Sequence, residues 1–216
     1  MERVICIIIG YCFGLFQTGY LYGRMHHIDV RSFGSGNAGT TNTMRVLGKK
    51  AGIITYLGDA LKAVFAGVVT VLLYGNSHEN ILFVLLLYTG LGVVLGHNFP
   101  FYMHFKGGKG IAASSGVILA LFDWKLILLA LFTFIIVTVI SKYVSLGSLC
   151  MMGGFFIELV VLGQLGMIDR LHPEERIEAY ILGFLLCAMA FVRHKANIQR
   201  LLNGTERKIG QKKEEA

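Results

Sequence analysis

The residues that could do chemistry in this chain gather in a few short, glycine-rich stretches that also carry arginine or lysine. The first stretch, at 31–52, reads RSFGSGNAGTTNTMRVLGKKAG. Glycines let a backbone approach an anion and expose successive N–H groups to it, and a guanidinium can bind phosphate through two parallel hydrogen bonds. The stretch therefore predicts a phosphate-binding loop, whereas the plainer alternative is a flexible solvated loop. Its candidate ligands are Ser35, Gly36, Asn37, Thr40, Thr41, Asn42 and Arg45.

The same stretch resembles two nucleotide-binding motifs, but neither interpretation fits the sequence around it. Gly34, Gly36 and Gly39 match the dinucleotide pattern G-x-G-x-x-G, but that pattern needs a preceding strand within a βαβ unit. Here the preceding segment is one that we expect to be a membrane helix, which leaves no place for a sheet. The P-loop pattern also starts at Gly34, but Thr40 stands where its lysine is required.

The second stretch, GHNFPFYMHFKGGKGIAASSG at 96–116, ends one apolar segment and leads into the next. Its core has two lysines around paired glycines. Helix N-termini and cations both favour phosphate, so this stretch predicts a second phosphate-binding element. The alternative is that the lysines only mark the cytoplasmic side of a turn. The candidate ligands are Lys106, Gly107, Gly108 and Lys109.

Two further polar elements follow, SKYVSLGS at 141–148 and RHKANIQRLLNGTERKIG at 193–210. The first places Ser145 at a turn, where helix capping is an equal alternative to substrate binding. If the second begins as a helix, His194, Asn197 and either Arg200 or Leu201 share one face. His194 could be a general base, or an interfacial histidine that only forms hydrogen bonds. The chain has no metal-ligand spacing among its histidines and cysteines, so we expect neither a metal nor a cofactor.

The composition identifies the environment of these stretches. Hydrophobic residues make up 55% of the 216 residues and charged residues 15%, and the mean hydropathy is +0.64. A soluble domain carries about 25% charged residues, so this is an integral membrane protein with all-α spans. The net charge of +7 does not indicate nucleic acid, because the basic residues lie in short runs between apolar segments. That distribution fits anionic lipid headgroups or phosphorylated substrates.

The apolar segments predict about seven transmembrane helices in a single polytopic domain, 1–216. A full span needs about 20 residues, so the fourth segment is short. With seven spans, 15 of the 20 Lys and Arg residues fall on one side and 4 on the other, which places the N-terminus outside and the C-terminus in the cytoplasm. The segments are 4–22, 52–74, 81–103, 110–122, 124–140, 146–166 and 177–192.

Charged residues inside apolar segments are costly and usually functional. Asp59 and Lys62 are three residues apart, so they can pair on one helix face and lower that cost. Glu158 has no partner nearby in the sequence. We expect Glu158 to be protonated or bonded across helices.

Three blocks together resemble a known family. GSGNAGTTNTMRVLGKKAG, GHNFPFYMHFKGGKG and RHKANIQRLLNGTERKIG look like the signature motifs of the bacterial acyl-phosphate:glycerol-3-phosphate acyltransferases, the PlsY type. The resemblance covers essentially the whole chain. It implies a seven-helix enzyme of the bacterial inner membrane that transfers a fatty acyl group from acyl phosphate to the 1-hydroxyl of sn-glycerol 3-phosphate. The products would be lysophosphatidic acid and inorganic phosphate, in the first step of phospholipid synthesis.

By position, the resemblance assigns roles to residues of this chain. Ser35, His194 and Asn197 correspond to catalytic positions. The positions carried over as substrate-binding are Arg45, Lys106, Gly107, Gly108, Lys109, Ser145 and Glu206, and the residue types of the first stretch add Gly36, Asn37, Thr41 and Asn42 to the predicted substrate site. Family members often carry arginine where this chain has Lys142. The expected partners are the two substrates and membrane lipids, with no nucleic acid, and the expected state is a monomer.

The residues favour direct acyl transfer, because no Ser-His-Asp order or clear nucleophile stands out. The other large class of glycerophosphate acyltransferases uses H-x-x-x-x-D, and none of the seven histidines has an aspartate five residues later. The alternative from a different class is a small transporter of phosphorylated solutes. Such a protein would have inverted repeats and a site at the membrane midplane, whereas these motifs lie at one surface.

Overall fold

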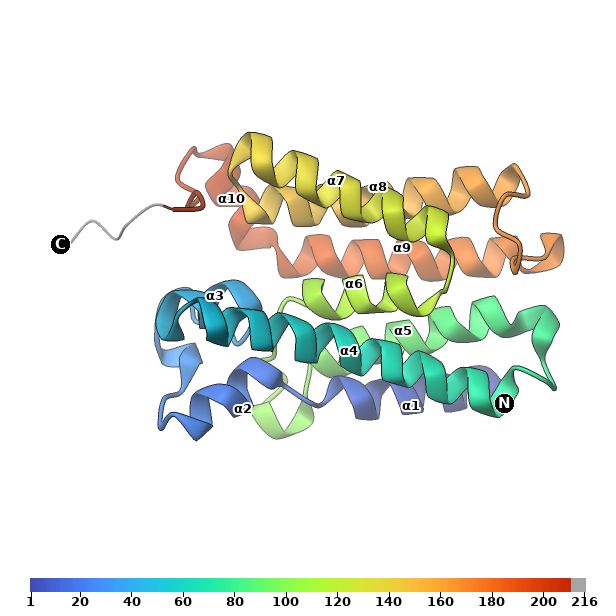
Figure 1. The fold of residues 1–216 in the computed structure, drawn as a ribbon, viewed down its shortest axis with the longest axis horizontal. Helices are drawn as coiled ribbons and strands as arrows, with labels where there is room; N and C mark the ends of the chain where they lie inside the picture. Colours follow the sequence, from blue (N-terminus) through green and yellow to red (C-terminus); the bar gives the residue numbers. More distant parts are fainter. Residues whose placement is uncertain (211–216) are drawn as a thin grey trace.

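The computed structural model describes residues 1–210 and contains no β-strand in that range, which agrees with the rejected dinucleotide fold. Lys212 and Lys213, which contribute to the charge count above, lie outside the described residues. Most helices run side by side along one axis (Figure 1). They are α1 (Glu2–Gly14), α2 (Thr18–Met25), α4 (Lys49–Tyr74), α5 (Leu82–Asn98), α6 (Ile111–Ala120), α7 (Trp124–Ser141), α8 (Val144–Gln164) and α9 (Arg176–Arg193).

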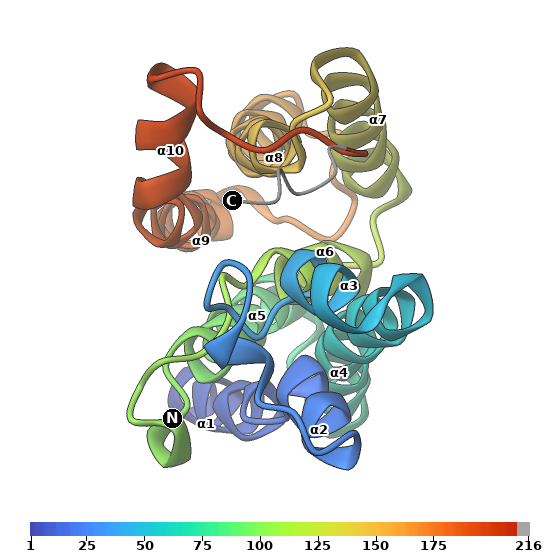
Figure 2. The same cartoon turned by 90° about the vertical axis from the view of Figure 1, so that its left-hand side faces the viewer.

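Two short helices, α3 (Thr40–Leu47) and α10 (Lys195–Leu202), lie together at one end of the bundle (Figure 1). Seen from that end, α7 to α10 form one group and α1, α2, α4 and α5 form another, with α6 between them (Figure 2). The core follows α5, whose span is 78% buried, whereas the span of α7 is only 17% buried. Helices that bury so little apolar surface within the protein are exposed to lipid, as in an integral membrane protein.

The number of spans is lower than predicted. Five helical segments are long and apolar enough to cross a membrane, and a sixth is obtained if Pro173–Arg193 and Lys195–Leu202, bent by 62°, are counted as one span. The segment predicted at 110–122 forms only the 10-residue helix α6. At about 1.5 Å per residue, α6 is about 15 Å long, half the roughly 30 Å hydrocarbon core. Figure 1 accordingly shows the turn from α6 to α7 well short of the end reached by α4.

The first span is also broken, which the uninterrupted apolar run at 4–22 does not reveal. The chain leaves the helix between α1 and α2, and non-helical backbone inside a bilayer must find hydrogen-bond partners within the protein. Lys62 donates to the carbonyl oxygens of Gly14 at 3.3 Å and Phe16 at 2.5 Å. Gln17 donates its side-chain N–H to Gly14 at 3.2 Å and to the His97 carbonyl at 3.0 Å. The break is therefore held by buried polar side chains.

The charged residues inside the apolar segments differ in whether they have a partner. Lys62 Nζ lies 3.0 Å from Asp59 Oδ1 and both side chains are buried, so the predicted pair is confirmed. Glu158 forms no hydrogen bond or ion pair within residues 1–210, and its Oε2 is buried. The expected bond from Glu158 to another helix is therefore not present in the described chain.

Several of the connections lie together at one end of the bundle. The stretch from α2 to α4, the loop between α5 and α6, and α10 all lie at the end that faces the viewer in Figure 2. The N-terminus lies at the opposite end (Figure 1). There, Arg3 donates to both oxygens of Glu178, at 2.5 and 2.8 Å, and Tyr88 donates to Glu178 at 2.7 Å. The glycine-rich stretches are thus gathered at one end, as the sequence predicts.

Candidate active site

A cavity of about 150 Å³ opens at the end of the bundle that carries α3 and α10. Four stretches that are far apart in the sequence meet in its wall, at 35–45, 109–112, 144–148 and 194–207. The polar side chains among these stretches are Ser35, Asn37, Thr40, Thr41, Asn42, Arg45, Lys109, Ser145, Ser148, His194, Asn197, Arg200, Glu206 and Arg207.

The first loop owes its shape to two glycines and one buried asparagine. Gly34 and Gly36 have φ values of +63° and +70°, which side-chain-bearing residues rarely adopt. Asn42 accepts from the Ser35 N–H at 2.7 Å, and its amide donates to the carbonyls of Val30 and Phe33. The Asn42 side chain thus fixes the loop around the cavity with three hydrogen bonds.

Three helix N-termini face the cavity. The lining includes Gly39 to Thr41 at the start of α3, Gly110 to Ala112 at the start of α6, and Val144 and Ser145 at the start of α8. A helix N-terminus carries unpaired N–H groups and a partial positive charge. Together these three ends make the cavity suited to anions, before any side-chain charge is counted.

Four cationic side chains add to this field: Arg45, Lys109, Arg200 and Arg207. The Arg45 side chain makes no hydrogen bond or ion pair with any other residue of the described range, so its donors are available to a ligand. Lys109 Nζ donates to Asn197 Oδ1 at 2.5 Å. Burial, together with the nearby arginines, lowers the pKa of Lys109 to about 8 against the opposing effect of Glu206. A bound anion would relieve this penalty.

Glu206 is a carboxylate in direct contact with this group of cations. Its Oε1 accepts from Ser145 at 2.9 Å and from Asn197 at 2.7 Å, and its Oε2 accepts from Arg200 at 2.7 Å. Burial raises the pKa of Glu206, but these hydrogen bonds outweigh it and the pKa is lowered overall. Glu206 therefore stays charged, and both of its oxygens are occupied by protein groups.

His194 lines the cavity, and one of its ring nitrogens is held by the backbone. Its Nδ1 lies 2.8 Å from the carbonyl oxygen of Ala190, which can only accept a hydrogen bond. A neutral ring therefore carries its proton on Nδ1 and leaves a lone pair on Nε2. His194, Asn197 and Arg200 all line the cavity, with His194 at the N-cap of α10, which begins at Lys195.

Some predicted site residues do not reach the cavity. Lys106 is exposed and outside the lining, and so is Gly36. Gly107 and Gly108 are buried beside the cavity, where their carbonyls accept from Arg193 at 3.0 and 2.9 Å. These two glycines shape the turn that carries Lys109.

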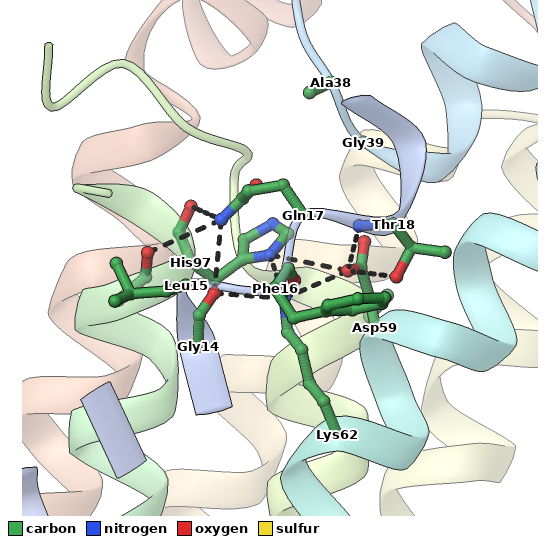
Figure 3. Close-up of polar contacts among 12 residues, drawn as sticks. Gly14, Leu15, Phe16, Gln17, Thr18, Ala38, Gly39, Asp59, Lys62 and His97 are labelled. Carbon is green, nitrogen blue, oxygen red and sulfur yellow. Dashed lines mark hydrogen bonds and ion pairs between the residues drawn. The ribbon is translucent and has the colours of Figure 1, made fainter. Parts of the chain in front are cut away.

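Sequence reasoning placed neither Asp59 nor His97 in the site, although both line the cavity. Asp59 accepts from Thr18 Oγ1 at 3.0 Å as well as from Lys62, and His97 Nδ1 lies 2.8 Å from Lys62 Nζ. Figure 3 shows this cluster at the break between α1 and α2. A charge within an apolar segment was the available signal for Asp59, whereas nothing in the spacing singled out His97. Arg207, Tyr56 and Ser148 were also missed.

Comparisons with known proteins give consistent results. A sequence model of the family described as "Glycerol-3-phosphate acyltransferase" matches residues 4–204. A glycerol-3-phosphate acyltransferase of Clostridioides difficile (strain 630) is 41% identical over 98% of this chain and 97% of its own length. One from Thermoanaerobacter sp. (strain X514) is 38% identical over 99% of each chain.

Two crystal structures have the same fold. Both are of PlsY (YgiH), described as an integral membrane glycerol 3-phosphate acyltransferase. The glycerol 3-phosphate form matches with a TM-score of 0.82 and 31% identity, over 97% of this chain and 96% of that one. The lysophosphatidic acid form matches with a TM-score of 0.80 and 30% identity over the same shares.

Proposed function

Since this chain belongs to the glycerol-3-phosphate acyltransferase family and is a PlsY-type enzyme that produces lysophosphatidic acid, we propose that the cavity at the α3 and α10 end is its active site and that acyl phosphate is its acyl donor. One observation carries this proposal. Four cations and three helix N-termini face a small cavity, and both carboxylate oxygens of Glu206 already accept hydrogen bonds from protein groups. The field therefore has a surplus of positive charge, as two phosphate-bearing substrates require.

The cationic side chains bind the phosphate groups, and the loop residues add neutral donors. Arg45 and Lys109 contact phosphate directly, with N–H groups from the starts of α3, α6 and α8. Ser35, Asn37 and Thr41 donate from the first loop. Glu206 acts one step away from the substrates, since it orients Ser145, Asn197 and Arg200 rather than facing an anion itself.

The transfer is a direct displacement at the acyl carbonyl. The 1-hydroxyl oxygen of glycerol 3-phosphate bonds to the carbonyl carbon, the bond from that carbon to the phosphate oxygen breaks, and inorganic phosphate leaves. Nε2 of His194 accepts the hydroxyl proton, since His194 lines the cavity and its Nδ1 is already bonded to the Ala190 carbonyl. The protein contributes mainly positioning and neutralisation of the leaving phosphate, and no residue forms a covalent intermediate.

We place the cavity on the cytoplasmic face of a bacterial inner membrane. The 15-to-4 division of basic residues supports this orientation, and the N-terminus and α10 lie at opposite ends of the bundle (Figure 1). The orientation requires that α6 and α7 form a helical hairpin that returns to the cytoplasmic face, although α6 is too short to cross alone. A monomer contains every residue of the proposed site.

The choice of donor is tested with purified enzyme and glycerol 3-phosphate, given either palmitoyl phosphate or palmitoyl-CoA. We expect lysophosphatidic acid and stoichiometric phosphate only from palmitoyl phosphate. Coenzyme A carries an adenine and an additional phosphate that need a pocket of their own outside the membrane, whereas an acyl phosphate needs only one small anion site and a chain in the bilayer. Comparable rates with the two donors would refute this part of the proposal.

A further inference from the structure

The cluster in Figure 3 has a feature that its structural role at the helix break does not explain. Lys62 Nζ lies within hydrogen-bond distance of the carbonyls of Gly14 and Phe16, of Asp59 Oδ1 and of His97 Nδ1. An ammonium group has three protons and no acceptor. His97 Nδ1 must therefore be the acceptor in its 2.8 Å contact with Lys62.

This contact fixes the orientation and the proton of the His97 ring. A neutral imidazole that accepts at Nδ1 carries its proton on Nε2. The Nε2 edge of the ring lies against Gly108, so closely that a Cβ at residue 108 would overlap it. Because His97 is 2% exposed, its ring fills the space directly beneath the Gly107–Gly108 turn.

Backbone hydrogen bonds join the same turn to the end of α5. The Gly108 N–H donates to the His97 carbonyl at 3.1 Å, and the Gly107 N–H donates to the Asn98 carbonyl at 3.1 Å. Arg193 holds the carbonyls of both glycines from the α9 side. The turn is thus clamped between two helices, and the next residue is Lys109, which enters the cavity.

We propose that His97 is a positioning residue for Lys109: the buried Asp59–Lys62 pair orients its ring, and its Nε2 edge supports the turn that aims Lys109 at substrate phosphate. The inference rests on the phosphate-binding role proposed for Lys109. Asp59 accepts hydrogen bonds from both Lys62 and Thr18. Its carboxylate therefore balances the charge of the Lys62 ammonium group and holds that group against the His97 ring.

Two substitutions of His97 distinguish the role of its Nδ1 edge from the role of its Nε2 edge. The amide oxygen of asparagine lies as many bonds from the backbone as Nδ1, so His97→Asn can still accept from Lys62 but leaves a gap under Gly108. The amide of glutamine reaches as far as Nε2, so His97→Gln still supports Gly108. We expect His97→Asn to weaken glycerol 3-phosphate binding at least tenfold, measured by calorimetry in detergent, with kcat at saturating substrate within about threefold of wild type. His97→Gln should retain more affinity than His97→Asn.

Glu178→Gln is the matched control, because it removes a charge partner of Arg3 at the far end of the bundle. It should reduce thermal stability without changing affinity for glycerol 3-phosphate. If Glu178→Gln weakened binding as much as His97→Asn, the effect would be general destabilisation and the inference would be wrong. An unchanged affinity in His97→Asn, or a weaker affinity in His97→Gln than in His97→Asn, would also overturn it.

A double variant shows whether His97 acts through Lys109. In a Lys109→Gln background, His97→Asn should weaken binding by less than twofold further, since the side chain that it positions is gone. Full additivity of the two effects would overturn the inference. If Lys109→Gln alone left the affinity unchanged, the proposed phosphate-binding role itself would fail, which is a result distinct from failure of the positioning role.

Discussion

The titration of Lys109 offers a direct test of the proposed phosphate site. Burial and neighbouring arginines lower the pKa of Lys109 to about 8, from about 10.4 for a lysine in water. A lowered lysine pKa means that the side chain is cationic below about pH 8 and neutral above it. Phosphate binding that depends on this cation should therefore weaken as the pH rises through 8.

The magnitude follows from the fraction of Lys109 that is protonated. With a pKa of about 8, about half of the free enzyme carries the charge at pH 8 and about a tenth at pH 9. The phosphate of glycerol 3-phosphate loses its second proton near pH 6, so its charge is constant in this range. The value of kcat/KM for glycerol 3-phosphate should thus fall about fivefold between pH 8 and 9.

The assay measures lysophosphatidic acid formation at subsaturating glycerol 3-phosphate from pH 6.5 to 9.5, for wild type and Lys109→Arg. An arginine stays cationic throughout this range, so the alkaline fall should disappear in the variant even if its rate is lower. Lys109→Gln, which has no charge at any pH, should lose about 2–4 kcal/mol of transition-state stabilisation and also show no fall. A fall that persists unchanged in Lys109→Arg would refute the reasoning.

Three further predictions address the other residues. Arg45→Ala should lose about 2–4 kcal/mol of transition-state stabilisation, measured from kcat/KM, with unchanged thermal stability. Lys106→Ala should lose less transition-state stabilisation, because Lys106 lies outside the cavity lining. A larger loss in Lys106→Ala than in Arg45→Ala would remove Arg45 from the site. His194→Gln should reduce kcat by roughly 10²–10⁴-fold with little change in KM, and a wild-type kcat would exclude His194 as the proton acceptor. Asp59→Ala or Lys62→Ala alone should destabilise the protein by about 3–5 kcal/mol, whereas replacing both with apolar residues should restore stability better. Normal melting temperatures in the two single variants would contradict a stabilising role for the buried pair.

Much of the fold is determined by the sequence, because a bilayer forces each apolar segment to satisfy its own backbone hydrogen bonds as a helix. The segment predicted at 52–74 corresponds to α4 at Lys49–Tyr74, and the segment at 177–192 to α9 at Arg176–Arg193. The alternation of apolar segments and basic stretches also places the four polar stretches at one end. These features depend on local composition and on segment order, both of which can be read along the chain.

Other features depend on contacts between distant residues. The break between α1 and α2 lies in a continuously apolar run, and it is stable because Lys62 and Gln17 bind the freed carbonyls. The short length of α6 also departs from the seven full spans that the segments suggest. Neither the break nor its partners can be recognised from residue types alone, because the partners come from other helices.

The active-site residues divide in the same way. The sequence identifies the stretches that carry Arg45, Lys109 and His194, since glycine and basic residues are distinctive wherever they occur. Only the tertiary structure decides that Lys109 enters the cavity while Lys106 faces solvent. Both lysines flank the same pair of glycines, so their types and spacing are equivalent. Their directions differ because α5 and α9 clamp the turn through His97 and Arg193, and packing between helices is set by the folded chain as a whole.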